Sequence, residues 1–310
     1  MTASRSPVFE RSHGTRPLLG LGAARFGAAL FKARGQFTQS DTVTSDGVRL
    51  ATWVGGAPAG RPVVLLHGFC GDHAAMRPLA QAIADRRRVV LYDARGHGKS
   101  GGFTGSARMR TLAEDLLTVL AAHAPNGADV VGLSMGAQTI FETLRIAGAG
   151  TLGRFVFIDQ SPRIASGPDW PHGLFGEMDP VELQRVLAEI RAQPRRLAQA
   201  WLRGLWRSDE HLAMKLLLSP SMLLGLRHVP EATLRLADDM LQQDWRHEVQ
   251  QLAHPTLLLY GGRSIYPGAG HWMADALPHA ELAFFAESGH ALVLEEPDRA
   301  ARALRRFLLA

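Results

Sequence analysis

One serine of the sequence stands in a setting that suits a nucleophile. The segment 132–136 reads GLSMG and has the pattern G-x-S-x-G around Ser134. It ends an apolar run at 129–133 that is typical of a buried strand, and it leads into a stretch at 136–147 with helical spacing. A sharp turn from strand to helix needs small flanking residues, and the helix N-terminus stabilises negative charge that develops there. We therefore predict nucleophilic chemistry at the Ser134 hydroxyl.

His290 is the best-placed base for that serine. A serine hydroxyl is a weak nucleophile until a neighbouring imidazole accepts its proton. His290 lies in the segment ESGH directly after the last expected strand, 282–285. The loop that leaves this strand reaches the edge of the sheet towards which Ser134 points. His67 and His97 lie in glycine-containing turns and are poorer candidates.

A glycine-rich loop at 66–71, LHGFCG, is the expected source of hydrogen-bond donors for acyl transfer. The tetrahedral intermediate of that reaction carries an oxyanion, which backbone N–H groups stabilise. We predict that the donors of this oxyanion hole are the backbone N–H groups of Phe69, in the loop, and of Met135, directly after the serine. Cys70 is interpreted as a small packed residue.

The elements that must position these groups alternate along the chain. Helical stretches separate short apolar runs, and a hairpin through Asp46-Gly47 precedes them; the runs are 62–66, 88–92, 129–133, 155–158, 256–260 and 282–285. This alternation predicts an α/β fold with a mostly parallel, doubly wound sheet. Between 161 and 251 only helical signals occur. We therefore expect a helical cap at 161–251, inserted into a core formed by 37–160 and 252–310.

The order of the motifs resembles that of the α/β-hydrolase superfamily. The motifs are the loop at 66–71, DARGHGKS at 93–100, GLSMG at 132–136 and SGH at 288–290, and they span most of residues 40–310. The resemblance implies the α/β-hydrolase fold, with the cap as a lid. Because the nucleophile here is a serine, the relatives with an aspartate at that position, the haloalkane dehalogenases and epoxide hydrolases, are not the best guide to the mechanism. The resemblance also implies that Asp93 and Arg95 brace loops near the site.

The sequence departs from this family at the acidic member of the catalytic triad. Many members carry an Asp in a G-x-x-D stretch after the penultimate strand, and Ser264 occupies that position here. The imidazolium formed in catalysis still needs a carboxylate partner. The other suitable loop follows the strand at 155–158, as in some relatives, and we predict Asp159 as the acid. Glu287 and Glu295 are weaker candidates; a dyad without an acid, and an Asp159 that only caps the turn into the lid, are the remaining alternatives.

Composition limits the class of partner. The 310 residues are 46% hydrophobic, which suffices for one sizeable core with an insertion. Residues 1–36 hold six basic side chains and one acidic one, which equals the whole net charge of +5. The body is then neutral, so no nucleic-acid partner is expected. The histidines lack metal-ligand spacing, and we expect neither a metal nor an organic cofactor. The single cysteine and the lack of a long apolar run favour a cytoplasmic protein.

The N-terminal extension 1–36 has several interpretations. Its stretch 18–31 is apolar apart from Arg25 and is flanked by basic residues. This composition fits a helix in a membrane interface, an Arg-rich targeting segment, or an extension helix without function. A cleavable signal peptide fits less well, because a clean apolar run and a small-residue exit are missing. A weak contact with a membrane surface through 1–36 is thus one expectation for this protein.

Together these residues predict a serine hydrolase of the carboxylesterase type, which cleaves an ester or related acyl bond through an acyl-enzyme. The Leu-, Met- and Trp-rich composition of 161–251 favours an apolar small-molecule substrate. Thioesterases, lactonases, amidases and C–C bond hydrolases would use the same residues. The alternatives are an acyltransferase, a cofactor-free haloperoxidase or perhydrolase and, less favoured, a ligand-binding relative without catalysis.

Overall fold

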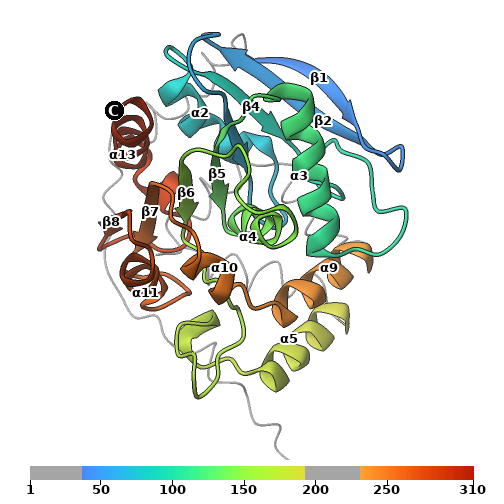
Figure 1. Cartoon of the computed structure of the whole chain (residues 1–310). Helices are drawn as coiled ribbons and strands as arrows, with labels where there is room; N and C mark the ends of the chain where they lie inside the picture. Colours follow the sequence, from blue (N-terminus) through green and yellow to red (C-terminus); the bar gives the residue numbers. More distant parts are fainter. Residues whose placement is uncertain (1–36, 193–230) are drawn as a thin grey trace, which may run out of the picture.

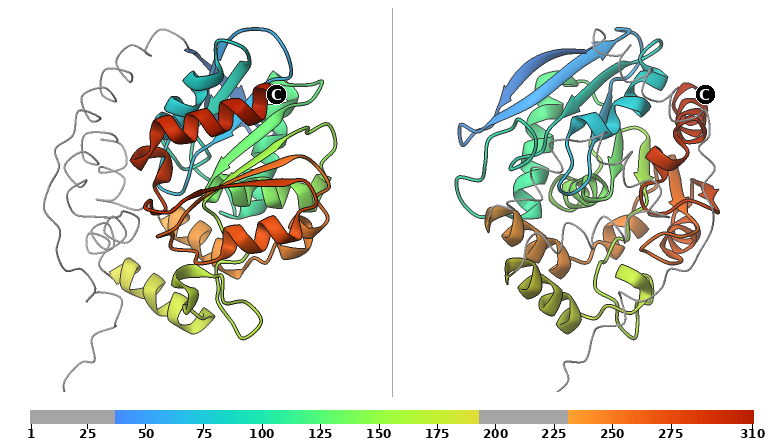
Figure 2. Two further views of the ribbon diagram at one scale, coloured as in Figure 1. Left: turned by 90° about the vertical axis from the view of Figure 1, so that its left-hand side faces the viewer. Right: turned by 180° about the vertical axis from the view of Figure 1, so that it is seen from behind.

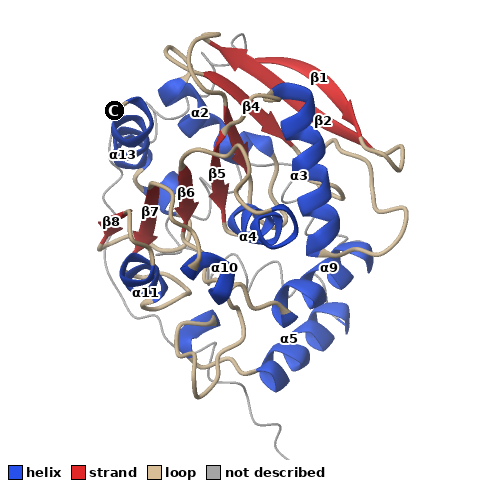
Figure 3. Cartoon of the chain, in the orientation of Figure 1, coloured by secondary structure: helices blue, strands red, loops and turns tan. Residues whose placement is uncertain are grey.

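The computed structural model describes residues 37–192 and 231–310, which form one sheet with helices on both faces (Figure 1, Figure 3). Within these ranges the sheet has eight strands in the order β1-β2-β4-β3-β5-β6-β7-β8. β2 pairs antiparallel with β1 and with β4, and every other pairing is parallel. The predicted α/β fold with a mostly parallel sheet is therefore confirmed. The strands are β1 (Phe37–Val43), β2 (Arg49–Gly56), β3 (Val63–Leu66), β4 (Arg88–Tyr92), β5 (Asp129–Leu133), β6 (Phe155–Ile158), β7 (Thr256–Gly261) and β8 (Ala280–Phe285).

The central strands are apolar on both faces because helices cover both. β3 reads VVLL and β6 reads FVFI, and every one of these residues is buried. One face of the sheet packs on α3 (Met109–His123), α4 (Met135–Ala147) and α11 (Ala269–Ala276). The other face packs on α2 (Arg77–Ile83) and α13 (Pro297–Leu309), which also contact each other. Figure 2 shows these two helical layers from the side. The two layers cover the faces of the sheet, and the ends of the strands lie outside them.

Two short helices follow β3. A 3-10 turn, η3 (His73–Met76), comes first, and α2 begins only at Arg77. The reason is Pro78, which has no N–H to donate and therefore fits the first turn of a helix but not its interior. The short helices α11 and α12 (Leu292–Glu295) carry too few periodic positions to stand out in the sequence.

Between β6 and β7 the regular elements of the described residues are helices. They are η4 (Leu174–Gly176), α5 (Pro180–Ala192), α9 (Glu231–Gln242) and α10 (Arg246–Gln250). Figure 1 shows α5 and α9 side by side, beyond the carboxyl ends of β5 and β6. Residues 193–230 of the predicted cap, and all of the predicted extension 1–36, lie outside the described residues. Among the helices that are described, none is long and apolar enough to cross a membrane.

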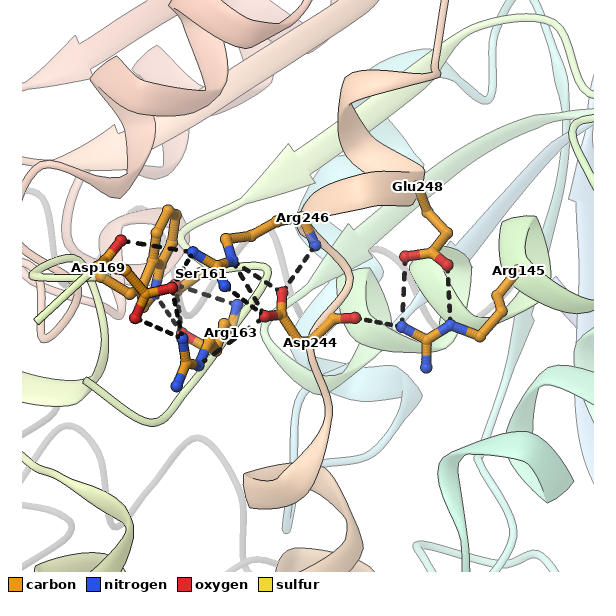
Figure 4. Close-up of polar contacts among 8 residues, drawn as sticks. Arg145, Ser161, Arg163, Asp169, Asp244, Arg246 and Glu248 are labelled. Carbon is orange, nitrogen blue, oxygen red and sulfur yellow. Dashed lines mark hydrogen bonds and ion pairs between the residues drawn. The ribbon is translucent and has the colours of Figure 1, made fainter. Parts of the chain in front are cut away.

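Salt bridges tie the two ends of this inserted segment to the core (Figure 4). Asp169 and Asp244 each contact both Arg163 and Arg246, at 2.7 to 4.0 Å. The chain that leaves β6 is thereby joined to the chain that leads into α10. Arg145 of α4 extends the network into the core, because its Nε lies 2.9 Å from a Glu248 carboxylate oxygen on α10.

Candidate active site

Ser134 lies at the turn from β5 to α4 in a backbone conformation that L-residues rarely adopt. Its φ is 53° and its ψ is −119°. The two glycines of the motif make this turn feasible. A Cβ on Gly132 would lie 2.5 Å from a backbone nitrogen of α4, and one on Gly136 would lie 2.5 Å from the Leu66 carbonyl oxygen. The Ser134 N–H donates to the Ile158 carbonyl (3.0 Å), which holds the turn against the end of β6.

His290 and Asp159 are far apart in the sequence and meet in the structure. The imidazole Nδ1 lies 2.7 Å from Asp159 Oδ2, and both side chains are buried. An ionised carboxylate only accepts hydrogen bonds, so Nδ1 carries the proton of the neutral ring. Nε2 is then left with a lone pair. This is the tautomer in which a histidine accepts a proton from serine.

Two further donors hold the Asp159 carboxylate. The Ser264 hydroxyl donates to Oδ2 (2.6 Å), and the Gly261 N–H donates to Oδ1 (2.9 Å). The residue itself has a φ of 47°, in the left-handed region that Asp tolerates better than most side chains do. Its own N–H donates to the Leu259 carbonyl (2.9 Å). The carboxylate is thus fixed by the end of β7 and by the turn that follows it.

The other acidic candidates make different contacts. Glu287 forms an exposed ion pair with Arg263, with a nitrogen–oxygen distance of 2.6 Å. Glu295 accepts a hydrogen bond from the Gly289 N–H (2.9 Å). Asp159, by contrast, is hydrogen-bonded to the His290 ring.

The loop after β3 lies directly against the serine. A Cβ on Gly68 would be 3.2 Å from Ser134 Cβ. His67 fastens this loop to the end of β4, because its Nε2 accepts from the Ala94 N–H (2.9 Å) and its Nδ1 bonds the Gly68 carbonyl (2.8 Å). Burial lowers the pKa of His67, which keeps the ring in the neutral form that these two bonds require. His67 therefore supports the loop and does not compete with His290 as the base.

Of the two predicted oxyanion donors, one belongs to this loop and the other to the residue directly after the serine. Phe69 follows Gly68 in this loop, and its ring packs edge-on against His97 at 5.8 Å between centroids. Met135 is the first residue of α4, where helix N–H groups have no partner within the helix. The next residue of the loop, Cys70, has a φ of 57°, and burial raises the pKa of its thiol to about 12. The thiol is therefore protonated at neutral pH.

Asp93 and Arg95 hold loops together, as the resemblance implies. Asp93 Oδ1 accepts from the His73 backbone N–H (2.7 Å) and Oδ2 accepts from the Lys99 N–H (2.7 Å). Arg95 forms a buried ion pair with Asp115 at 2.6 Å. These bonds join the loops after β3 and β4 to each other and to α3.

Comparison with known proteins agrees with this arrangement. The family described as alpha/beta hydrolase fold matches residues 61–205. A pimeloyl-[acyl-carrier protein] methyl ester esterase of Chromobacterium violaceum is 30% identical over 260 residues, which cover 80% of this chain and 94% of that protein. The protein of the same name from Xanthomonas axonopodis pv. citri is 31% identical and covers 82% and 96%. The chain belongs to the α/β-hydrolase family.

Solved structures share the fold of this α/β-hydrolase. An esterase from Exiguobacterium antarcticum has a TM-score of 0.78 at 19% identity, covering 88% of this chain and all of the other. A bromoperoxidase from Bacillus anthracis has a TM-score of 0.77 at 20% identity, with the same coverage. Such low identity speaks for the fold alone. With the curated relatives, the findings confirm the predicted reaction class: this α/β-hydrolase acts on ester bonds, and the haloperoxidase alternative is not favoured.

Sequence reasoning missed two groups at this α/β-hydrolase site. Ser264, in the turn after β7, and Gly261, the last residue of that strand, both donate to Asp159. A signal for the first was present, since a serine stands where many family members have the acid. The backbone N–H of Gly261 gave no signal, because any residue but proline supplies that donor.

Proposed function

We propose that Ser134, His290 and Asp159 form the catalytic triad of this ester hydrolase. The 2.7 Å hydrogen bond between His290 Nδ1 and Asp159 Oδ2 carries the proposal. Ser134 follows β5, Asp159 follows β6 and His290 comes after β8, and these strands run parallel in one sheet. Their carboxyl ends therefore open on the same edge, where α/β folds place their ligand sites.

The reaction follows from the tautomer of His290. Nε2 accepts the Ser134 proton while Oγ forms a bond to the ester carbonyl carbon. The tetrahedral intermediate expels the alcohol oxygen, which takes the proton from Nε2, and an acyl-serine remains. Water then attacks this acyl group and gives a proton to Nε2. Collapse of the second intermediate returns that proton to Ser134 Oγ and releases the acid.

The backbone N–H groups of Phe69 and Met135 serve as the oxyanion hole in this proposal. Two features support them. The loop glycine beside Phe69 lies against Ser134, and Met135 begins a helix whose N-terminal N–H groups face the serine turn. Donors held in fixed positions stabilise the oxyanion without reorganising, and removing one such donor from an enzyme typically lowers kcat about a hundred- to a thousandfold.

The inserted segment 161–251 acts as a lid over this site in our proposal, and 37–160 with 252–310 is the catalytic core. Its described helices lie at the edge where the triad loops end (Figure 1). The curated relatives are named for a methyl ester of a pimeloyl group on an acyl-carrier protein. We therefore propose a small-alcohol ester at the end of an apolar acyl chain as the substrate.

The test compares two sets of esters. p-Nitrophenyl esters from acetyl to dodecanoyl measure the basic reaction, and methyl esters of dicarboxylic acids of increasing length measure the substrate preference. The proposal predicts turnover of both sets, with kcat/KM for the methyl esters rising to a maximum at a medium chain length. Ser134→Ala is the control and is expected to abolish turnover. Turnover that survives in Ser134→Ala would contradict the proposed triad. Methyl esters that the protein hydrolyses no faster than buffer does would contradict the proposed substrate.

A further inference from the structure

Ser264 stands at the position where many family members carry the catalytic acid, and it contacts Asp159, the acid proposed here. Ser264 stands in the turn directly after β7, and its Oγ lies 2.6 Å from Asp159 Oδ2. The same oxygen accepts the hydrogen bond of His290 Nδ1 at 2.7 Å. A hydroxyl and an imidazole N–H thus converge on one carboxylate oxygen.

A second hydrogen bond sets the direction of the Ser264 hydroxyl. The Tyr266 N–H donates to Ser264 Oγ at 2.9 Å. With one lone pair engaged in this way, the hydroxyl hydrogen is directed to its carboxylate neighbour, which has no proton of its own to offer when ionised. The order of donors is therefore Tyr266 N–H, then Ser264 O–H, then Asp159 Oδ2.

The turn that carries Ser264 is attached to the loop that carries His290. The Arg263 N–H donates to the Ser288 carbonyl at 2.9 Å. A Cβ on Gly261 would lie 2.4 Å from that same carbonyl oxygen, so the two segments are in close contact. Because Ser264 sits on this shared support, its hydroxyl fixes the carboxylate relative to the imidazole.

We infer that Ser264 is a positioning residue, whose hydroxyl holds the Asp159 carboxylate in line with His290 Nδ1. The inference rests on the proposed triad and adds a fourth member to it. Without this bond, Oδ2 keeps only the His290 Nδ1–H as a donor, and the carboxylate is held less firmly in line with the ring. The loss acts on the reaction through Asp159 and leaves substrate binding unaffected.

A double-mutant cycle tests the inference with a medium-chain p-nitrophenyl ester. Ser264→Ala is expected to lower kcat about 10- to 100-fold with KM nearly unchanged, and Ser264→Thr, which keeps the hydroxyl, to restore most of it. In an Asp159→Asn background the same alanine substitution is expected to have less than a threefold further effect, because the group it acts through is already lost. If the alanine variant does not fold, Ser264→Cys replaces it, since a thiol is a weak donor of nearly the same shape.

Ser288→Ala is the matched control. The Ser288 hydroxyl lies in the loop that carries His290 and also donates to a carboxylate at 2.6 Å, but the acceptor is Glu296. Its loss is expected to change kcat less than threefold. The inference would be overturned if Ser264→Ala and Ser288→Ala lowered kcat equally, or if the effects of Ser264→Ala and Asp159→Asn on kcat were fully additive. Neither result would contradict the triad. Turnover that persists in Ser134→Ala would instead overturn the proposed function.

Discussion

Replacing Asp159 by asparagine is the most informative single change at this site. The carboxylate accepts from three groups: the His290 Nδ1–H, the Ser264 hydroxyl and the Gly261 N–H. Asparagine has the same shape but only one acceptor oxygen, and its NH2 group donates. It cannot satisfy three converging donors. We therefore expect the protein to stay folded while the hydrogen bonds to the ring change.

The two orientations of the amide give different losses. If the amide oxygen still accepts from the Gly261 N–H, the amide NH2 faces His290 Nδ1. This favours the tautomer with the proton on Nε2, and that nitrogen then cannot accept the Ser134 proton. If the oxygen faces the ring, the NH2 meets the Gly261 N–H, and an unsatisfied buried donor costs about 1–3 kcal/mol. The first orientation is thus favoured. We expect kcat to fall about a thousand- to ten-thousandfold, which equals about 4–5.5 kcal/mol of transition-state stabilisation.

The assay measures kcat and KM with a p-nitrophenyl ester, together with the thermal midpoint of unfolding. Ser134→Ala gives the baseline for turnover that does not use the site. An Asp159→Asn variant that is folded and retains more than a tenth of wild-type kcat would refute the reasoning. A fall of about a thousand- to ten-thousandfold in kcat, to a value still above the Ser134→Ala baseline and with KM unchanged, would agree with it.

Three further perturbations test the packing and charge near the site. Burial lowers the pKa of His97 from 6.5 to about 4, so the stability that the neutral ring contributes is present above pH 6.5 and is lost as the pH falls towards 4. Between pH 7 and pH 5, the free energy of unfolding in urea should therefore fall by about 2 kcal/mol more for wild type than for His97→Asn, and equal falls would contradict this. Because burial raises the pKa of the Cys70 thiol to about 12, iodoacetamide at pH 8 should alkylate the native protein roughly 50-fold more slowly than the urea-unfolded chain, since the greater nucleophilicity of a high-pKa thiolate offsets part of its scarcity; similar rates would refute it. Gly136→Ala brings a Cβ to 2.5 Å from the Leu66 carbonyl oxygen and should cost at least about 2 kcal/mol of stability, so an unchanged thermal midpoint would count against the close packing of this turn.

The core strands could be read from the sequence because helices cover both faces of the sheet. The runs 88–92, 129–133 and 155–158 coincide with β4, β5 and β6, since burial on both sides leaves a continuous apolar signal with sharp ends. The α2 region was less predictable, because Pro78 moves the start of the helix and a 3-10 turn comes before it.

The candidate site was predictable where a motif marks it. G-x-S-x-G and the histidine after the last strand name two residues directly. Asp159 followed from the missing acid at position 264 together with the resemblance to relatives that carry the acid after the strand at 155–158. The contacts of Ser264 depend on two turns that are 105 residues apart, and neither spacing nor composition reports such a contact. The roles assigned to these side chains stay predictions until they are measured.

The central claim is that ester cleavage passes through an acyl-enzyme on Ser134. The direct measurement is rapid acid quench of the protein with a p-nitrophenyl ester, followed by mass spectrometry of its peptides. Our account predicts a transient acyl group on the peptide that contains Ser134, formed as fast as the burst of p-nitrophenol, and absent from Ser134→Ala. A burst with the acyl group on another residue, or turnover that continues in Ser134→Ala, would contradict it.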